Sequence, residues 1–256
     1  MAENDPISQF EIHELVPFEI NGFNLAFTNS SFFMVLTIVS VTLLMALATS
    51  KRAVVPGRGQ SVAELLYGFV ADMVRSTTGN EGLRFFPFVF TLFMFILMAN
   101  MLGMFPYFPA PGGHSFTITS HVIVTATLAV SVMALVIGFG LFKHGFGFLK
   151  VFVPSGVPWY ILWFVVIIEV FSFFSRPLSL AIRLFANILA GHILLKVFAG
   201  FIPALLAAGW FGLISPAPLF MVVALTGLEF LVAFLQAYVF AILTCIYLND
   251  ALHPGH

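Results

Sequence analysis

Long apolar runs separated by short polar or Pro/Gly-rich stretches form the main pattern of this chain. Crossing a bilayer core of about 30 Å takes about 20 consecutive apolar residues in a helix. We therefore predict membrane-crossing helices over residues 31–49, 85–105, 121–142, 159–200 and 219–248. The stretch 61–77 differs, because its apolar residues fall on one side of a helix and its charged residues elsewhere. That pattern is typical of an amphipathic helix lying on the membrane surface.

Composition supports a multi-pass membrane protein. Of the 256 residues, 61% are hydrophobic and 8% are charged, whereas a soluble domain carries about 25% charged residues. The net charge is −1 and no basic patch is present, so we expect no nucleic-acid partner. The single cysteine, Cys245, excludes an internal disulfide and a cysteine-based metal site. We expect neither a cofactor nor a bound metal.

The loop lysines and arginines predict the orientation of the chain. They all fall in segments that would share one side of the membrane: Lys51, Arg52, Arg58, Arg75, Arg84, Lys143 and Lys150. Residues 1–30, 106–120 and 201–218 contain no lysine or arginine. Because cytoplasmic loops are enriched in these cations, the N-terminus is predicted outside, and five crossings leave the C-terminus inside.

The element over 159–200 is longer than a perpendicular crossing requires. Its 42 or so residues extend roughly 63 Å at 1.5 Å per residue, about twice the hydrocarbon thickness. Two separate spans would place Arg176 and Arg183 in an external loop, against the charge bias. One tilted helix, with a kink at Pro177, keeps the orientation consistent. The final element is also overlong, so the two predict a slanted helical hairpin.

The predicted fold class is an all-α integral membrane protein with three roughly upright spans, one interfacial amphipathic helix and a long, strongly tilted C-terminal helical hairpin. We expect a single membrane domain over residues 1–256. In it, 1–30 is an external arm, 31–158 holds the upright spans and the interfacial helix, and 159–256 is the hairpin with the ion path. Within the arm, residues 6–15 fit a short amphipathic helix.

A polar stripe runs along the 159–200 element. Helical spacing places six residues on one face, at steps of three and four: Glu169, Ser172, Arg176, Ser179, Arg183 and Asn187. An arginine at the middle of a bilayer costs about 2.5–3.5 kcal/mol and indicates a functional site facing a partner or a water-filled cavity. The alternative is a structural ion pair between Glu169 and Arg176.

The polar residues of the last two elements also match each other in level. In an antiparallel pair, residues at one level have numbers with a roughly constant sum, which pairs Arg183 with Gln236, His192 with Glu229, and Glu169 with Asp250. This agreement favours one shared polar path.

His192 and Glu229 are candidates for a proton relay, because histidine and carboxylate side chains are common proton carriers. A buried structural histidine is the alternative for His192. Asn100 either lines the path or bonds a neighbouring helix.

Two segments resemble one known family. The run Ser175–Asn187, SRPLSLAIRLFAN, is similar to the signature of subunit a of the rotary F-type ATP synthases, and so is Leu235–Thr244, LQAYVFAILT. The resemblance covers essentially the whole chain. The family's essential arginine falls on Arg183, its characteristic glutamine on Gln236 and its asparagine on Asn187. Ala186 stands where the family often has glycine. Many bacterial members carry the acid and the histidine in the order opposite to His192 and Glu229.

The resemblance implies a stationary, non-catalytic proton channel pressed against a rotating ring of hairpin subunits, each with a buried carboxylate. Two offset half-channels would carry protons to and from the ring, and Arg183 would keep the passing carboxylate ionised and prevent leakage. His192 and Glu229, with Asn100 beside them, would feed protons from outside, and Glu169 and Asp250 would line the inner exit.

The partners that the resemblance implies are the ring subunits, peripheral-stalk b-type subunits, the lipid bilayer and, indirectly, the catalytic ATPase head. Both a bacterial cytoplasmic (inner) membrane and a mitochondrial inner membrane fit, and the bacterial one is our prediction. Whether the coupling ion is H⁺ or Na⁺ stays open, because the partner ring would decide it.

Three other classes fit less well. A secondary transporter usually shows internal repeats, and none is visible in this sequence. An intramembrane enzyme would need a motif such as His-Glu-x-x-His or Gly-x-Ser-x-Gly, and neither is present. A purely structural anchor would not need a charged stripe.

Overall fold

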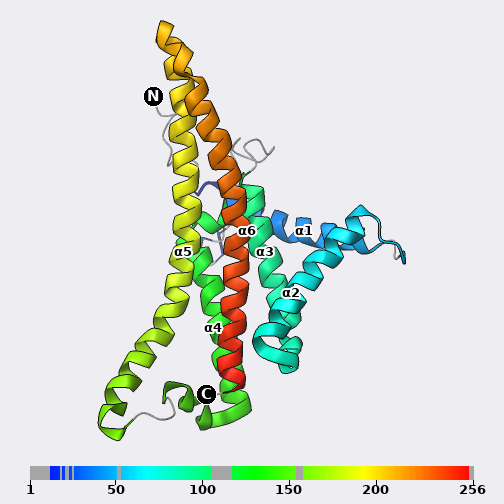
Figure 1. Ribbon diagram of the computed structural model, residues 1–256, viewed down its shortest axis with the longest axis vertical. Coiled ribbons are helices and arrows are strands. Elements are labelled where there is room, and N and C mark those ends of the chain that lie inside the picture. Colours follow the sequence, from blue (N-terminus) through cyan, green and yellow to red (C-terminus); the bar gives the residue numbers. More distant parts are fainter. Residues whose placement is uncertain are drawn as a thin grey trace. The chain divides into compact units, whose positions relative to one another are not determined.

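The computed structural model describes residues 12–17, 19–20, 23–24, 26–50, 53–104, 117–153 and 158–253. Within these ranges the chain is almost entirely helical (Figure 1). The α-helices are α1 (Asn29–Thr49), α2 (Arg58–Gly82), α3 (Phe86–Met104), α4 (Val122–His144), α5 (Trp159–Ala207) and α6 (Pro216–Leu252). Four short 3₁₀ segments join or precede them: η3 (Leu83–Phe85), η4 (Ile118–Ser120), η5 (Gly145–Phe152) and η6 (Gly209–Ile214).

Five helical stretches in the described ranges are long and apolar enough to cross a membrane. Each coincides with one of the five spans predicted from the sequence to within one residue or extends beyond it, so the all-α membrane class is confirmed. The upright and tilted orientations of the individual helices stay predictions, as does the single membrane domain.

The amphipathic helix is α2, which is longer than the predicted 61–77. It buries a face that includes Ala63, Val70 and Val74, while Glu64 and Asp72 are exposed. Its last turn is interrupted by Gly79, which has a left-handed φ of 66°. Glycine adopts such an angle without steric strain because it has no Cβ atom. After this break, η3 leads directly into α3.

The helix α5 is continuous over 49 residues, and α6 over 37. The single long element that the charge bias predicted is therefore present, and α5 continues through Pro177. Between the two helices the chain turns at Gly209, whose φ of 69° is again left-handed, and passes through η6.

The predicted helix over residues 6–15 is wrong where the structure describes it. Glu14–Val16 forms strand β1, which pairs antiparallel with β4 (Phe27–Thr28), and β2 (Glu19–Ile20) pairs with β3 (Phe23–Asn24). Residues 6–11 lie outside the described residues. Backbone pairing with a distant partner decided the outcome here, because strands of two or three residues leave almost no local pattern.

The contacts group the chain into two compact units. The first contains residues 1–42, 95–121 and 184–236, and the second contains 43–94, 122–183 and 237–256. Five of the predicted site residues fall in the first unit: Asn100, Asn187, His192, Glu229 and Gln236. The other five fall in the second: Glu169, Arg176, Ser179, Arg183 and Asp250.

Candidate functional site

His192 and Glu229 line a common cavity in the first unit, as their matched levels predicted. The cavity has a volume of about 10 Å³, and its other walls are Met104, Asn187, Ile188 and Val232. This is about the space that one water molecule needs. Three of the six lining side chains are polar, so the cavity can hold a water or pass a proton between α5 and α6.

The carboxylate of Glu229 lies against the backbone of α5 at Gly191. A Cβ atom added to Gly191 would lie 2.5 Å from Oε1 of Glu229, which is closer than real Cβ contacts come. Both carboxylate oxygens are shielded from solvent and accept no hydrogen bond from the described residues. A buried carboxylate without partners is costly, and the adjoining cavity is where a water molecule can bond it. Gly191, which no sequence pattern singles out, therefore makes room for this carboxylate.

A hydroxyl-bearing segment reaches His192 from another part of the first unit. Oγ1 of Thr117, just before η4, lies 2.9 Å from Nε2 of His192. Thr117 is 2% exposed. In the sequence, residues 106–120 are recognisable only as a loop without lysine or arginine. The run Thr117-Ile118-Thr119-Ser120 beside a predicted span is the signal that could have pointed to a buried polar contact.

Asn100 is fully buried and bonded on both sides. Its Nδ2 donates to the carbonyl of Ala233 in α6 over 3.3 Å, and its Oδ1 accepts from Oγ1 of Thr119 over 2.7 Å. Asn100 is not among the residues that line the cavity beside His192. This geometry matches the alternative in which Asn100 bonds a neighbouring helix.

Gln236 and Asn187 connect α6 to α5 in the same unit. Nδ2 of Asn187 donates to Oε1 of Gln236 over 3.1 Å. Gln236 is only 4% exposed, and its Nε2 is buried without an acceptor among the described residues. Asn187 is exposed overall, yet it also lines the cavity beside His192. Asn187 thus lies on an exposed face of α5, lines the cavity and bonds the buried Gln236.

Arg176, in the second unit, is held between two carboxylates. Its Nη2 lies 3.3 Å from Oε1 of Glu169, and its Nη1 lies 3.3 Å from Oδ2 of Asp250. The guanidinium also lies over the ring of Tyr247, 5.9 Å from its centre. The three charged side chains are 29–36% exposed. The ion pair considered as an alternative for Arg176 is present, and Asp250 extends it to α6.

Arg183 has a different environment from Arg176, although both lie on α5. Its side chain is exposed, and no carboxylate of the described residues lies within salt-bridge distance of it. Ser179 is exposed as well, and its hydroxyl donates to the backbone carbonyl of Arg176 over 3.0 Å. Arg183 therefore presents a permanent charge that this chain, as far as the structure describes it, does not neutralise.

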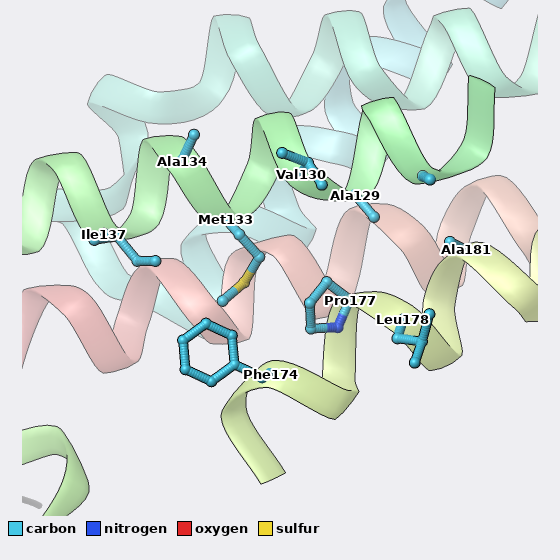
Figure 2. A pocket seen from close by; sticks show the side chains of 10 residues that line it. Ala129, Val130, Met133, Ala134, Ile137, Phe174, Pro177, Leu178 and Ala181 are labelled. Carbon is cyan, nitrogen blue, oxygen red and sulfur yellow. The ribbon is translucent and has the colours of Figure 1, made fainter. Parts of the chain in front are cut away.

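A pocket in the second unit has apolar walls and is lined by none of these polar groups. It has a volume of about 440 Å³ and lies between α4 and α5. Figure 2 shows Met133 and Ala129 of α4 facing Phe174, Pro177 and Leu178 of α5 across it. None of the side chains that line it is titratable. Among the described residues no group of three or more His, Cys, Asp or Glu side chains could hold a metal ion.

Comparison with known proteins gives a consistent result over the whole length. The family described as ATP synthase A chain matches residues 31–249. The ATP synthase subunit a of Maricaulis maris is 72% identical over 258 aligned positions, covering 100% of both chains. The subunit a of a Chelativorans species is 60% identical and that of Allorhizobium ampelinum 59%, each over 98% of this chain. The chain therefore belongs to the family of ATP synthase subunit a, the non-catalytic proton-channel subunit of the membrane sector.

Proposed function

We propose that Arg183 is the electrostatic gate between two offset half-channels that carry protons to and from a rotating ring of carboxylate-bearing subunits. The observation that carries the proposal is the contrast between two arginines of α5. Arg176 is bound by two carboxylates of its own chain, whereas Arg183 is exposed and has no carboxylate partner among the described residues. A permanent charge at membrane depth is too costly to be left without a role, so its counter-charge comes from a partner.

The magnitude of the interaction is sufficient for this role. Two opposite charges 4 Å apart attract by about 4 kcal/mol at an effective dielectric of about 20, which corresponds to roughly three pKa units. A ring carboxylate that reaches Arg183 therefore loses its proton and stays ionised while it passes. Arginine does not deprotonate in proteins, so Arg183 cannot carry the proton across and the two half-channels stay separate.

The half-channel that delivers protons is built around His192 and Glu229. Both line the cavity beside α5, and Asn187 joins that cavity to Gln236. Histidine and carboxylate groups exchange protons readily. Asn100 acts here as a support, because both ends of its amide are bonded to neighbouring segments.

The half-channel that releases protons uses Glu169 and Asp250 on either side of Arg176. Two carboxylates and one guanidinium leave a net charge of about −1, which favours the passage of cations. Ser179, which lies on α5 with Glu169 and Arg176, is the remaining polar residue that we assign to this half-channel. A potential of 100 mV across the membrane contributes about 2.3 kcal/mol per proton that crosses.

The assembly follows from the family. We propose that the ring subunits contact the exposed face of α5 that carries Arg183. Peripheral-stalk b-type subunits hold this chain stationary, and this chain is connected to the catalytic head only through those subunits. The curated relatives come from bacteria, which supports a bacterial inner membrane. The positive-inside rule supports an external N-terminus and an internal C-terminus.

Proton pumping by the complete synthase in inverted membrane vesicles tests the gate. Arg183→Ala is expected to abolish ATP-driven acidification of the vesicles while the synthase remains assembled. Arg75→Ala, which removes an exposed arginine from α2, is the matched control and is expected to pump at nearly the wild-type rate. Normal pumping by Arg183→Ala would overturn the proposal.

A second variant tests the delivery half-channel. Glu229→Leu removes the carboxylate and keeps the side chain of similar size, so it is expected to slow proton delivery more than it lowers the amount of assembled subunit. Comparing the pumping rate with the subunit level on the same vesicles separates the two effects. An equal loss of both would indicate a structural pair between His192 and Glu229.

A further inference from the structure

A short buried segment inserts two threonine hydroxyl groups among the helices of the first unit. Thr117, Thr119 and Ser120 are each no more than 3% exposed. Oγ1 of Thr119 donates to Asn100 of α3, and Oγ1 of Thr117 lies 2.9 Å from Nε2 of His192 in α5. The segment is also braced internally, because Oγ of Ser120 donates to the carbonyl of Thr117 over 2.6 Å.

The place of Thr117 against α3 depends on a glycine. A Cβ atom added to Gly103 would overlap the hydroxyl oxygen, Cβ and Cγ2 of Thr117. The neighbouring residue, Met104, lines the same cavity as Glu229 and His192. The threonine therefore sits in a space that only glycine leaves open, and its hydroxyl is turned toward the imidazole ring.

We propose that Thr117 is a positioning residue for His192, and that its hydroxyl holds the imidazole ring at the cavity shared with Glu229. This inference rests on the proposed role of His192 in proton delivery. Thr117 does not itself carry the proton across the cavity. It fixes one ring nitrogen so that the ring cannot turn away between successive protons.

A threonine hydroxyl is suited to this position because of its bonding capacity. It has one donor hydrogen and two acceptor lone pairs, and the hydrogen rotates to suit its partner. It can therefore donate to a neutral ring nitrogen and accept from a protonated one. The contact then survives each gain and loss of a proton by His192, whereas a valine side chain of the same shape supports neither bond.

Three substitutions in the complete synthase, in inverted vesicles, test the proposal. Thr117→Val keeps the shape and removes the hydroxyl, and is expected to lower the pumping rate per assembled complex about tenfold, the factor that about 1.4 kcal/mol produces. Thr117→Ser keeps the hydroxyl and is expected to recover most of that loss. Thr119→Val removes an equally buried hydroxyl from the same segment without touching His192, and serves as the matched control.

A double substitution separates positioning from folding. If Thr117 acts only through His192, Thr117→Val causes no further loss in a His192→Gln background, whereas Thr119→Val acts the same in both backgrounds. Gly103→Ala pushes Thr117 away from His192 by another route, so it is expected to behave like Thr117→Val in both backgrounds.

Two results would overturn the inference. One is an equal loss for Thr117→Ser and Thr117→Val, since the hydroxyl would then not matter. The other is an undiminished effect of Thr117→Val in the His192→Gln background. Arg183→Ala, measured in parallel, distinguishes the causes of failure. If Arg183→Ala stops pumping while Thr117→Val does not slow it, the proposed gate stands and only the role of Thr117 is lost.

Discussion

Asn187 donates a hydrogen bond from Nδ2 to Oε1 of Gln236 over 3.1 Å, and this bond joins α5 to α6. Gln236 is buried and Asn187 is exposed, so the pair connects an open helix face to the interior of the first unit. The bond gives a direct test of whether the two residues act together.

We expect Asn187→Ala and Gln236→Ala each to slow pumping about fivefold, since a neutral hydrogen bond contributes roughly 1 kcal/mol. Because both remove the same bond, the double variant is expected to be no more than slightly slower than either single one. Pumping rates per assembled complex give the coupling. Thr226→Ala, which loses only a bond to Val222 of its own helix, is the control. Fully additive losses would show that the pair does not act as a unit.

Gly191→Ala tests the close approach of Glu229 to α5. The added Cβ would lie 2.5 Å from Oε1 and 3.2 Å from Cδ of Glu229, so the carboxylate must move away from its place beside His192. We expect slower pumping with the synthase still assembled. Gly200→Ala, on the same helix with no atom within 4 Å of the new Cβ, is expected to have little effect.

Shortening the acidic side chain at position 229 is expected to compensate for Gly191→Ala. Glu229→Asp removes one methylene and draws the carboxylate back from position 191, so it is expected to restore part of the pumping that Gly191→Ala loses. An additive loss in the double variant would mean that the two sites do not meet in the working protein.

Arg176 is expected to contribute to assembly through charge balance. Arg176→Gln leaves Glu169 and Asp250 facing each other without their cation, and removing one partner of such a cluster is worse than removing all its charges. The side chains are about one-third exposed, so we expect a loss of only about 1 kcal/mol. The measurement is the amount of this chain in purified membranes. The triple variant Glu169→Gln, Arg176→Gln, Asp250→Asn should recover that amount. A triple variant poorer than Arg176→Gln would rule out charge balance as the cause.

Asn100→Leu separates the two alternatives for this residue. The change leaves the hydroxyl of Thr119 without its acceptor and the carbonyl of Ala233 without its side-chain donor, and an unsatisfied buried group costs about 1–3 kcal/mol. We expect less assembled subunit but a nearly normal pumping rate for each complex that does assemble. Normal assembly with slow pumping would instead place Asn100 in the proton path.

Most helices could be predicted because a crossing helix leaves a long and simple signal. The predicted spans over 31–49 and 121–142 differ from α1 and α4 by no more than two residues at any end, since about 20 apolar residues satisfy their backbone only as a helix in lipid. The short strands near Glu14 and the buried η4 segment were missed. Their conformations depend on partners far along the chain, such as Thr28 for Glu14 and Asn100 for Thr119.

The candidate site, like the fold, could be predicted from the sequence only in part. The spacing of polar residues along α5 and α6 was sufficient to match His192 with Glu229, because helix geometry alone sets the level of each side chain. It also placed Glu169 and Asp250 together, and the structure bonds both to Arg176. The spacing could not supply Thr117 and Gly191, which matter only through what packs against them.

By itself the sequence determined the membrane class, the long final helices and the family, because these follow from local apolar length and from a contiguous motif. Only the tertiary structure showed which of the two arginines of the motif is bonded by carboxylates of this chain. Arg176 and Arg183 share one residue type, one helix and one periodic stripe, so helical spacing alone does not determine which of them is neutralised. The difference arises from whether carboxylates of this chain come within bonding distance, which is decided by how the helices pack.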